Sequence, residues 1–270
     1  MQNWHPISLL NVNYKLAAQA IAGRLLKVIH LVVAEDQTCG VPGRYIGENV
    51  AFLRDVVSYA TMFDSPVAIL SLDQEKAFDR VDWSFMYSTL CRMGFGTSFL
   101  QWVYLFYTGV QNSVNVNGYL PPFSSLSCGV RQGCPLSPLL YFLVAEVLAC
   151  NIRTNPRIKG LCLPGQSDAI SPISQYADDT SLVVCSDDAI SACFNVYDVY
   201  ERGSGSRLNL SKSKGLWLGP WANRSDLPVG LDWSSVKIKV LGVFLGHENL
   251  DDDNWKPRIV AVGNILLSWC

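Results

Sequence analysis

The stretch QYADDTSLVV, residues 175–184, places two adjacent acids, Asp178 and Asp179, in a segment that otherwise has the composition of a protein interior. Residues 182–184 predict a buried strand, and residues 176–177 can pair back onto it across a tight turn. Neighbouring carboxylates repel each other, and burying them costs several kcal/mol each unless a cation offsets their charge. The stretch therefore predicts a β-hairpin whose tip carries either a solvated polar turn or a metal-binding pair of acids.

A third acid follows another predicted strand. Residues 67–72 (VAILSL) are apolar and β-prone, come after Pro66 and lead directly into Asp73. If this strand lay beside the hairpin, two or three carboxylates would converge. Mg²⁺ prefers oxygen ligands and takes one or two carboxylates together with phosphate oxygens. Two such ions about 3.5 to 4 Å apart can stabilise the attacking and leaving oxygens of a phosphoryl transfer. Acids at strand ends are common, so this pairing alone does not decide the function.

Helical patterns surround these strands. Apolar residues recur at helical spacing within residues 21–32 and 53–60, so the N-terminal part is expected to be mainly helical. Ser137-Pro138 predicts the start of a buried helix, and Asn117-Gly118 predicts a two-residue hairpin turn after the alternating Val114 and Val116. Further helix starts are expected at Asp82, Thr97 and Ser186 or Asp187, and a late strand at residues 236–240. Helices mixed with antiparallel hairpins predict an α+β fold with a sheet backed by helices.

The composition is that of a globular protein with an ample core. The chain has 270 residues, of which 49% are hydrophobic and 16% charged, and its formal net charge is −2. Any site for a polyanion must therefore be local, and the acid-free basic run from Arg202 to Lys214 is a candidate, with a solvated face as the alternative. Nine cysteines without a CxxC pair are interpreted as small core residues in a reducing compartment. The longest apolar run, residues 138–145, is too short to span a membrane.

Seven blocks of the sequence occur in an order that matches one known family. They are NWHPISLLNVNYKL (3–16), DQTCGVPGRYIGEN (36–49), LSLDQEKAFDRVDW (70–83), GVRQGCPLSPLLY (129–141), QYADDT (175–180), GSGSRLNLSKSK (203–214) and VLGVFLG (240–246). Together they resemble the reverse transcriptase domain of LINE-type non-LTR retrotransposons, across almost the whole chain. The resemblance implies a right-hand polymerase with fingers and palm. In such an enzyme a primer 3′ hydroxyl attacks the α-phosphate of a deoxynucleotide at two Mg²⁺ ions, for which Mn²⁺ can substitute.

The resemblance also implies roles for single residues. Asp73, Asp178 and Asp179 match the catalytic, metal-binding acids, with Asp178 as the most direct ligand. Phe78 matches the aromatic residue that closes over the sugar and excludes a 2′ hydroxyl, with core packing as its alternative role. The other matched positions are Gln132 and Gly133 at the incoming nucleotide and template, His5 and Arg44 at the substrate, Lys212 near the leaving pyrophosphate, and Leu241 and Gly242 in the primer-gripping hairpin. A solvated charge is the alternative for Lys212, and a simple turn before the helix is the alternative for Gly133.

The first block departs from the family pattern at one position. His5 stands where the family usually carries an arginine that is expected to contact the triphosphate. The resemblance further predicts fingers at residues 1–66, a palm with inserted fingers segments at residues 67–246, and the start of a thumb or connection at residues 247–270. With the thumb largely missing, the chain is expected to be a piece of a longer polyprotein.

Three functions stay open on the sequence. The leading one is an RNA-directed DNA polymerase that works with an RNA template, a DNA primer or target, deoxynucleoside triphosphates and the rest of a retrotransposon polyprotein. It is expected in a cytoplasmic ribonucleoprotein and the nucleus, is not secreted and has no membrane partner. An RNA-directed RNA polymerase shares paired acids on a hairpin, but Phe78 and the QGCPLSP block favour the DNA enzyme. The third is a catalytically impaired nucleic-acid-binding relic, which His5 and the short chain favour and the three intact acids oppose.

Overall fold

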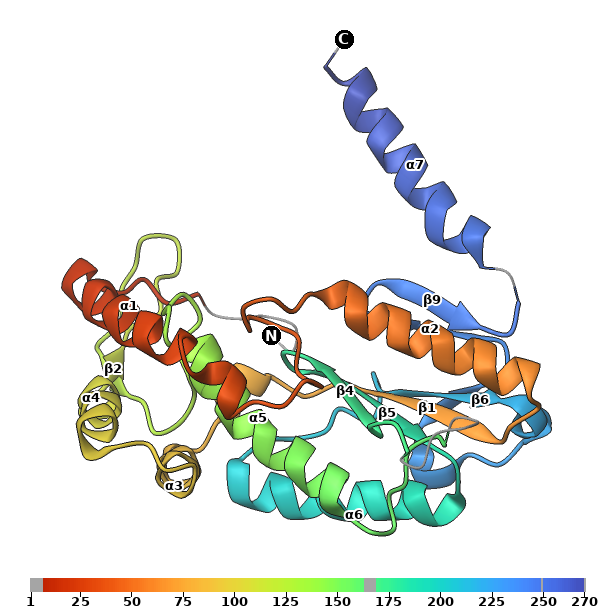
Figure 1. Ribbon diagram of the computed structural model, residues 1–270. Coiled ribbons are helices and arrows are strands. Elements are labelled where there is room, and N and C mark those ends of the chain that lie inside the picture. The colour runs from red at the N-terminus through yellow and green to blue at the C-terminus, as the bar shows by residue number, and fades with distance from the viewer. Residues whose placement is uncertain (1–6, 163–168, 249, 270) are drawn as a thin grey trace.

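The largest sheet in the computed structural model has five strands, within the residues that the structure describes, which are 7–162, 169–248 and 250–269 (Figure 1). In spatial order these strands are β4 (Ile173–Tyr176), β5 (Asp179–Val184), β1 (Val67–Leu72), β6 (Lys214–Leu218) and β7 (Asp232–Ser234). Neighbouring strands are antiparallel, except that β6 and β7 are parallel. The two strands predicted within residues 67–72 and 175–184 are confirmed, and they are direct neighbours.

The middle strand, β1, is buried on both faces of the sheet. Its successive side chains point to opposite faces, as the pleat of a strand requires. Ala68, Leu70 and Leu72 belong to one hydrophobic cluster, and Val67 and Ile69 belong to a second. Burying each of the larger side chains contributes about 1.5 to 3 kcal/mol. Burial on both sides explains why this strand is almost continuously apolar instead of alternating between apolar and polar residues.

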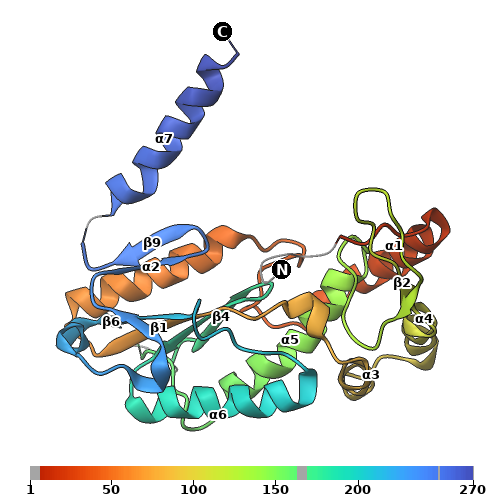
Figure 2. The same cartoon turned by 180° about the vertical axis from the view of Figure 1, so that it is seen from behind.

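Each face of the sheet has its own cover (Figures 1 and 2). The helices α5 (Ser137–Thr154) and α6 (Asp187–Ser204) pack into the first cluster. The helix α2 (Ile46–Met62) and the hairpin of β8 (Lys237–Val240) and β9 (Val243–Gly246) pack into the second. The chain therefore has an α+β fold with a sheet backed by helices, as the sequence indicated.

The remaining elements flank this sheet, and several of them gather around one end of α5 in Figure 1. They are α1 (Val12–Leu26), α3 (Trp83–Arg92), α4 (Thr97–Tyr107), the short pair β2 (Gln111–Asn112) and β3 (Ser124–Ser125), the 3-10 helices η1 (Ile29–Leu31), η2 (Ala77–Arg80), η3 (Gly219–Asn223) and η4 (Pro228–Gly230), and the last helix, α7 (Asp251–Leu267). The predicted burial of α5 is confirmed, since even its Glu146 is only 7% exposed.

Two of the predicted helix starts have the expected side-chain caps. The Asp82 carboxylate accepts a hydrogen bond from the Phe85 backbone N–H at 2.8 Å and begins α3. The Ser186 hydroxyl accepts one from the Ala189 N–H at 3.1 Å and begins α6. Each cap satisfies one of the backbone donors that a helix leaves unpaired at its N-terminus.

Other local predictions are partly wrong. Gly96, not Thr97, is the N-cap residue of α4, and Thr97 is its first helical residue. The Asn117-Gly118 turn forms, with φ values of +50° and +86°, but its only pairing in the described residues is an isolated bridge, so no strand runs through Val114. The late strand begins at Lys237, one residue later than predicted, and the exposed Val236 lies outside it.

The cysteines are mostly not core residues. Eight of them lie in the described residues, and all eight are free thiols. Cys134 and Cys193 are buried, whereas Cys91, Cys128, Cys150 and Cys162 are exposed. The interpretation of the cysteines as small core residues is therefore wrong for half of the described ones.

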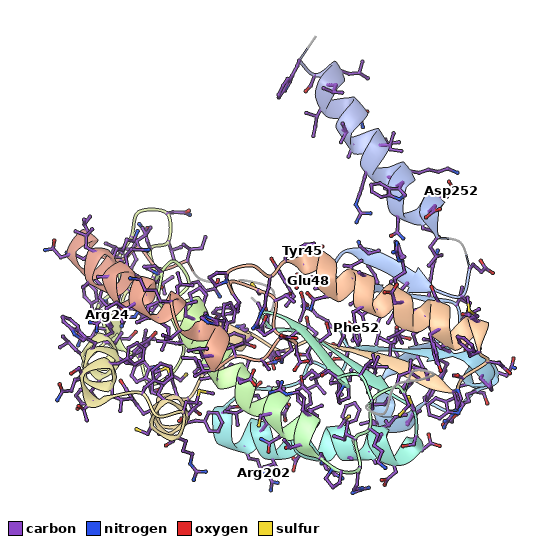
Figure 3. All side chains as sticks on the ribbon, viewed as in Figure 1. Arg24, Tyr45, Glu48, Phe52, Arg202 and Asp252 are labelled. Carbon is purple, nitrogen blue, oxygen red and sulfur yellow. The ribbon has the colours of Figure 1, made fainter. Side chains whose placement is uncertain are left out.

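The last helix, α7, stands away from the sheet in Figures 1 to 3. None of its described residues is buried. The Asn254 side chain ties its first turn to β9, because it accepts a hydrogen bond from the Phe244 N–H at 2.8 Å and donates one to the Phe244 carbonyl at 3.1 Å. The assignment of residues 247–270 to a thumb, like the other subdomain boundaries, stays a prediction. Among the described helices, none has the combined length and apolar character needed to cross a bilayer.

Candidate active site

The three predicted acids lie at one end of the sheet. Asp73 follows the last residue of β1, Asp178 lies in the turn between β4 and β5, and Asp179 begins β5. In the antiparallel register of β1 and β5, Leu72 pairs with Thr180. Continuing that register by one residue on each strand places Asp73 beside Asp179. The structure therefore brings together the acids that the sequence separates by about a hundred positions.

The acids influence one another electrostatically. The pKa of Asp179 is raised from 3.8 to about 6, by desolvation first and then by the negative charges of Asp178 and Asp73. Asp179 keeps contact with solvent, whereas Asp73 and Asp178 are half-buried. In the part of the chain that the structure describes, no three His, Cys, Asp or Glu side chains form a group that could hold a metal ion. The arrangement is thus a crowded set of carboxylates, not a finished metal centre.

The backbone around Asp73 is held by the segment that follows α6. The Asp73 N–H donates to the Ser213 hydroxyl at 3.0 Å, and the Asp73 carbonyl accepts from the Asn209 N–H at 2.8 Å. Two positions further on, the Glu75 N–H donates to the Arg207 carbonyl at 2.8 Å. Ser213 is fully buried. Sequence reasoning missed Ser213 and Asn209, because nothing in the local pattern indicates which distant residue will border Asp73.

Phe78, the predicted sugar-contacting residue, is half-buried on η2. Its ring stacks on that of Tyr141 in α5, with centroids 4.4 Å apart and planes 19° from parallel. The buried Tyr141 hydroxyl in turn donates to the Gln74 side-chain oxygen at 3.3 Å. One face of Phe78 is therefore packed against the protein, as the core-packing alternative requires. Its action on a sugar stays a prediction.

The loop before α5 holds the two residues assigned to the nucleotide and template. The Gln132 carbonyl accepts from the Ser8 N–H at 2.9 Å, and the Gln132 side-chain amide donates to Asp79 at 3.4 Å. Gly133 is exposed and has a φ of +98°. A Cβ at this position would lie 3.0 Å from the Ser8 carbonyl oxygen. Glycine is therefore favoured at position 133 chiefly by the positive φ, and the close Ser8 carbonyl adds to this preference.

The match to a known family covers most of the chain. Residues 1–245 match the family described as reverse transcriptase (RNA-dependent DNA polymerase). The chain belongs to this reverse transcriptase family. Curated relatives place it in the LINE-type, non-LTR class. The Transposon TX1 uncharacterized 149 kDa protein of Xenopus laevis is 40% identical over 250 residues, which make up 92% of this chain and 19% of that protein.

Two further comparisons agree with this assignment. The Retrovirus-related Pol polyprotein from type-1 retrotransposable element R2 of Popillia japonica is 26% identical over 78% of this chain and 29% of its own length. The apo telomerase from Candida tropicalis, truncated from the C-terminal domain, superposes with a TM-score of 0.55 at 12% identity, over 88% of this chain and 44% of that one. At so low an identity, the superposition shows a shared fold alone. The chain spans less than a third of the length of the two curated relatives.

The Arg44 side chain of this reverse transcriptase domain is directed toward backbone groups of the chain itself. Its guanidinium donates to the backbone carbonyls of Val33 at 3.1 Å and Gln37 at 2.9 Å, and also to that of Ala34. Through these bonds Arg44 stabilises the loop at residues 33–37. A contact between Arg44 and the substrate stays a prediction.

The remaining two predicted substrate residues are Lys212 and His5. Lys212 is exposed at the end of the loop that follows α6. His5 lies outside the described residues.

The predicted primer-gripping residues form the turn of the β8–β9 hairpin. Leu241 and Gly242 have φ values of +49° and +78°, and the strands pair directly from Val240 to Val243. Positive φ at both central residues is typical of a type I′ turn, whose twist matches that of the strands. The Gly242 carbonyl accepts from the Arg258 guanidinium of α7 at 2.6 Å. The hairpin that was inferred from the family is thus present, and its contact with a primer stays a prediction.

Three of the four charges in the basic run from Arg202 to Lys214 form ion pairs within the reverse transcriptase domain. The ion pairs are Arg202 with Asp198 at 2.9 Å, Arg207 with Glu75 at 3.6 Å and Lys214 with Asp232 at 3.7 Å. Arg202 lies on the outer side of α6 (Figure 3). Exposed pairs of this kind contribute about 0 to 1 kcal/mol each. Because their charges have partners, the run is a weaker candidate for binding backbone phosphates than its sequence indicated.

Proposed function

We propose that this domain is the polymerising part of an RNA-directed DNA polymerase, which joins deoxynucleotides to a primer 3′ hydroxyl on an RNA template. The observation that carries the proposal is the meeting of Asp73, Asp178 and Asp179 where β1 ends and β5 begins. A member of the reverse transcriptase family with this arrangement has the acids that nucleotidyl transfer requires. The shared α+β fold supports the proposal.

The donor chemistry of the site fits divalent metal ions. All three side chains offer carboxylate oxygens, which are the ligands that Mg²⁺ prefers. The raised pKa of Asp179 reports desolvation and mutual repulsion, and a bound cation would offset both. After their side chains turn toward a common point, Asp73, Asp178 and Asp179 would hold two Mg²⁺ ions, or Mn²⁺ in their place. Such ions supply charge stabilisation for the attacking hydroxyl and the leaving pyrophosphate.

Other residues of the chain would bind and orient the nucleotide. Phe78 would present the exposed part of its half-buried side chain to the sugar, while Tyr141 supports the packed face. Gly133 lacks a side chain in an exposed loop, so backbone groups there can approach a base or phosphate closely. Lys212 would place a mobile positive charge near the leaving pyrophosphate. His5 and Arg44 are the remaining substrate candidates, and Leu241 with Gly242 would touch the primer end.

The partners follow from the reaction and from the kind of protein in which relatives of this domain occur. We propose an RNA template, a DNA primer or target, deoxynucleoside triphosphates and the rest of a retrotransposon polyprotein. The printed names of the R2 relatives, which are Pol polyproteins of retrotransposable elements, support the polyprotein. A telomerase neighbour from Candida albicans was solved in complex with a TWJ fragment of telomeric RNA, which supports an RNA partner. A cytoplasmic ribonucleoprotein and the nucleus are the proposed locations.

Primer extension tests the proposal directly. The chain is incubated with an RNA template, a DNA primer, deoxynucleotides and Mg²⁺, and extension of the primer is expected. Asp73→Ala and Asp178→Ala should each abolish extension while circular dichroism shows an intact fold, because each removes a carboxylate from the site. Asp55→Ala, at an exposed position of α2, is the matched control and should keep activity.

The possible outcomes separate the competing functions. A near wild-type rate in either active-site variant would show that the assignment of the acids is wrong. Binding of an RNA–DNA duplex by the unmutated chain without any extension would favour the impaired relic. Preferential use of ribonucleotides would favour an RNA-directed RNA polymerase.

A further inference from the structure

The turn that carries Asp178 contains a backbone conformation that needs support. Ala177, which directly precedes Asp178, has a φ of +56°. Residues with a Cβ adopt this left-handed region at a cost, because the Cβ crowds the backbone. Ala177 is followed at once by both acids of the hairpin, so the direction of their side chains depends on this one residue. Some other part of the protein must therefore stabilise the turn.

One side chain holds both backbone groups of Ala177. The Gln37 side-chain oxygen accepts the Ala177 N–H at 2.9 Å, and the Gln37 side-chain nitrogen donates to the Ala177 carbonyl at 3.1 Å. The same oxygen accepts the Cys39 N–H at 3.1 Å. Gln37 is 1% exposed. A primary amide offers a donor and an acceptor side by side, so it pairs with the peptide groups of Ala177 as a neighbouring strand would.

Gln37 is itself fixed to the rest of the fold. The Gln175 N–H of β4 donates to the Asp36 carbonyl at 2.8 Å, and the Thr38 N–H donates to the Gln175 carbonyl at 3.1 Å. The Gln37 carbonyl accepts from the Arg44 guanidinium at 2.9 Å. Residues 36–38 are therefore hydrogen-bonded to β4, the strand that leads into the turn at Ala177. A shift of Gln37 relative to Ala177 would break bonds on both of its sides.

We propose that Gln37 is a positioning residue for the active site, which sets the direction of Asp178 and Asp179 by holding Ala177 in its left-handed conformation. Arg44 contributes because its guanidinium donates a hydrogen bond to the Gln37 backbone carbonyl and so fixes the position of Gln37. This inference rests on the proposed role of the acids in nucleotidyl transfer. It differs from an ordinary core role for a buried glutamine, because it predicts that the effect of losing Gln37 passes through the conformation of residue 177.

The test uses a pair of substitutions. Gln37→Met keeps the length of the side chain but removes both bonds to Ala177, and we expect kcat for primer extension to fall about tenfold, the order implied by the left-handed preference of glycine over residues with a Cβ. The Michaelis constant for deoxynucleotides should stay nearly unchanged, because Gln37 does not touch them. Adding Ala177→Gly should restore much of kcat, because glycine adopts this conformation without help. Gln101→Ala, at an exposed glutamine of α4, is the control.

A second measurement needs neither activity nor a metal. Hydrogen exchange of the Ala177 amide in the unmutated, metal-free protein should be slow, and should speed up in Gln37→Met or, if methionine unfolds the protein, in Gln37→Ala. Fast exchange in the unmutated protein would overturn the proposal. A loss of kcat that Ala177→Gly does not restore would overturn it too, and would leave Gln37 as a core residue. If the unmutated chain extends no primer, the proposed function fails, while amide exchange still decides whether Gln37 holds Ala177.

Discussion

Replacing Asp179 by asparagine should stabilise the metal-free protein at neutral pH. The pKa of about 6 lies above the ordinary value of 3.8, so the folded state holds the proton more tightly than the unfolded chain does. At pH 7.5 the ionised Asp179 therefore opposes folding, through desolvation first and then through the charges of Asp178 and Asp73. Asparagine is nearly the same size and carries no charge, so Asp179→Asn removes this opposition and leaves the β4–β5 pairing in place.

The size of the effect follows from the pKa difference. A difference between 3.8 and about 6 would correspond to about 3 kcal/mol if Asp179 were shielded from water. Because Asp179 is exposed, solvent screening reduces this to about 1 kcal/mol. A gain of that size raises the melting temperature of a chain of this length by about 2 to 4 °C.

The sign of the effect also predicts its pH dependence. Above about pH 6 the folded protein carries the full cost of the charge. The cost disappears as the pH falls from about 6 to about 4, where Asp179 is protonated in the folded state before it is protonated in the unfolded chain. The difference in stability between the variant and the unmutated protein should therefore be present at pH 7.5 and nearly absent at pH 4.

Thermal and urea unfolding in the presence of a chelator, at both pH values, would measure this difference. Asp55→Asn, at an exposed position of α2, is the matched control and should change the free energy of unfolding by less than about 0.5 kcal/mol at either pH. Added Mg²⁺ should raise the stability of the unmutated protein more than that of Asp179→Asn. A variant no more stable than the unmutated protein at pH 7.5, or equally stabilised at both pH values, would refute the electrostatic account of the acid cluster.

Three further predictions concern the substrate and the core. Phe78→Ala should increase ribonucleotide relative to deoxynucleotide incorporation on one template, and an unchanged ratio would assign Phe78 to core packing alone. Arg153→Met should cost about 3 to 5 kcal/mol in urea unfolding, because it leaves the nearly buried Asp36 and Glu146 carboxylates without their ion-pair partner; a cost below about 1 kcal/mol would show that the buried pairs contribute little. On the sequence alone, His5→Arg should lower the Michaelis constant for deoxynucleotides, by an amount equivalent to at most about 1.5 to 3 kcal/mol in binding, and the unmutated chain should work better near pH 6 than its relatives do, because a protonated His5 partly replaces the missing charge. Equal Michaelis constants of the two forms at every pH from 6 to 8 would show that His5 is not at the triphosphate.

Local patterns were sufficient to predict the main strands and several helix starts, whereas the roles of single residues came from the resemblance to a family. A run such as VAILSL predicts a buried strand because apolar β-prone residues bounded by a proline have few other stable conformations. The tip of QYADDTSLVV predicts a turn because adjacent carboxylates avoid burial. The caps at Asp82 and Ser186 depend on residues only three positions away. Each of these inferences uses interactions within one strand or one helical turn, and such interactions are visible in the order of the residues.

Contacts between distant segments could not be obtained in this way. The side-chain amide of Gln37 holds Ala177, and the hydroxyl of Ser213 holds the N–H of Asp73, each across 140 positions of the chain. Arg44 was assigned to the substrate from its motif, yet its guanidinium binds the carbonyls of its own loop. The periodicity of apolar residues in the sequence predicts which face of a helix or strand a side chain occupies. Which distant residue that side chain contacts depends on how the helices and strands pack together. The positions of the acids in this reverse transcriptase domain were therefore predictable from sequence, whereas the groups that hydrogen-bond the backbone beside them were decided only when the sheet brought β1, β5 and the loop at residues 33–37 together.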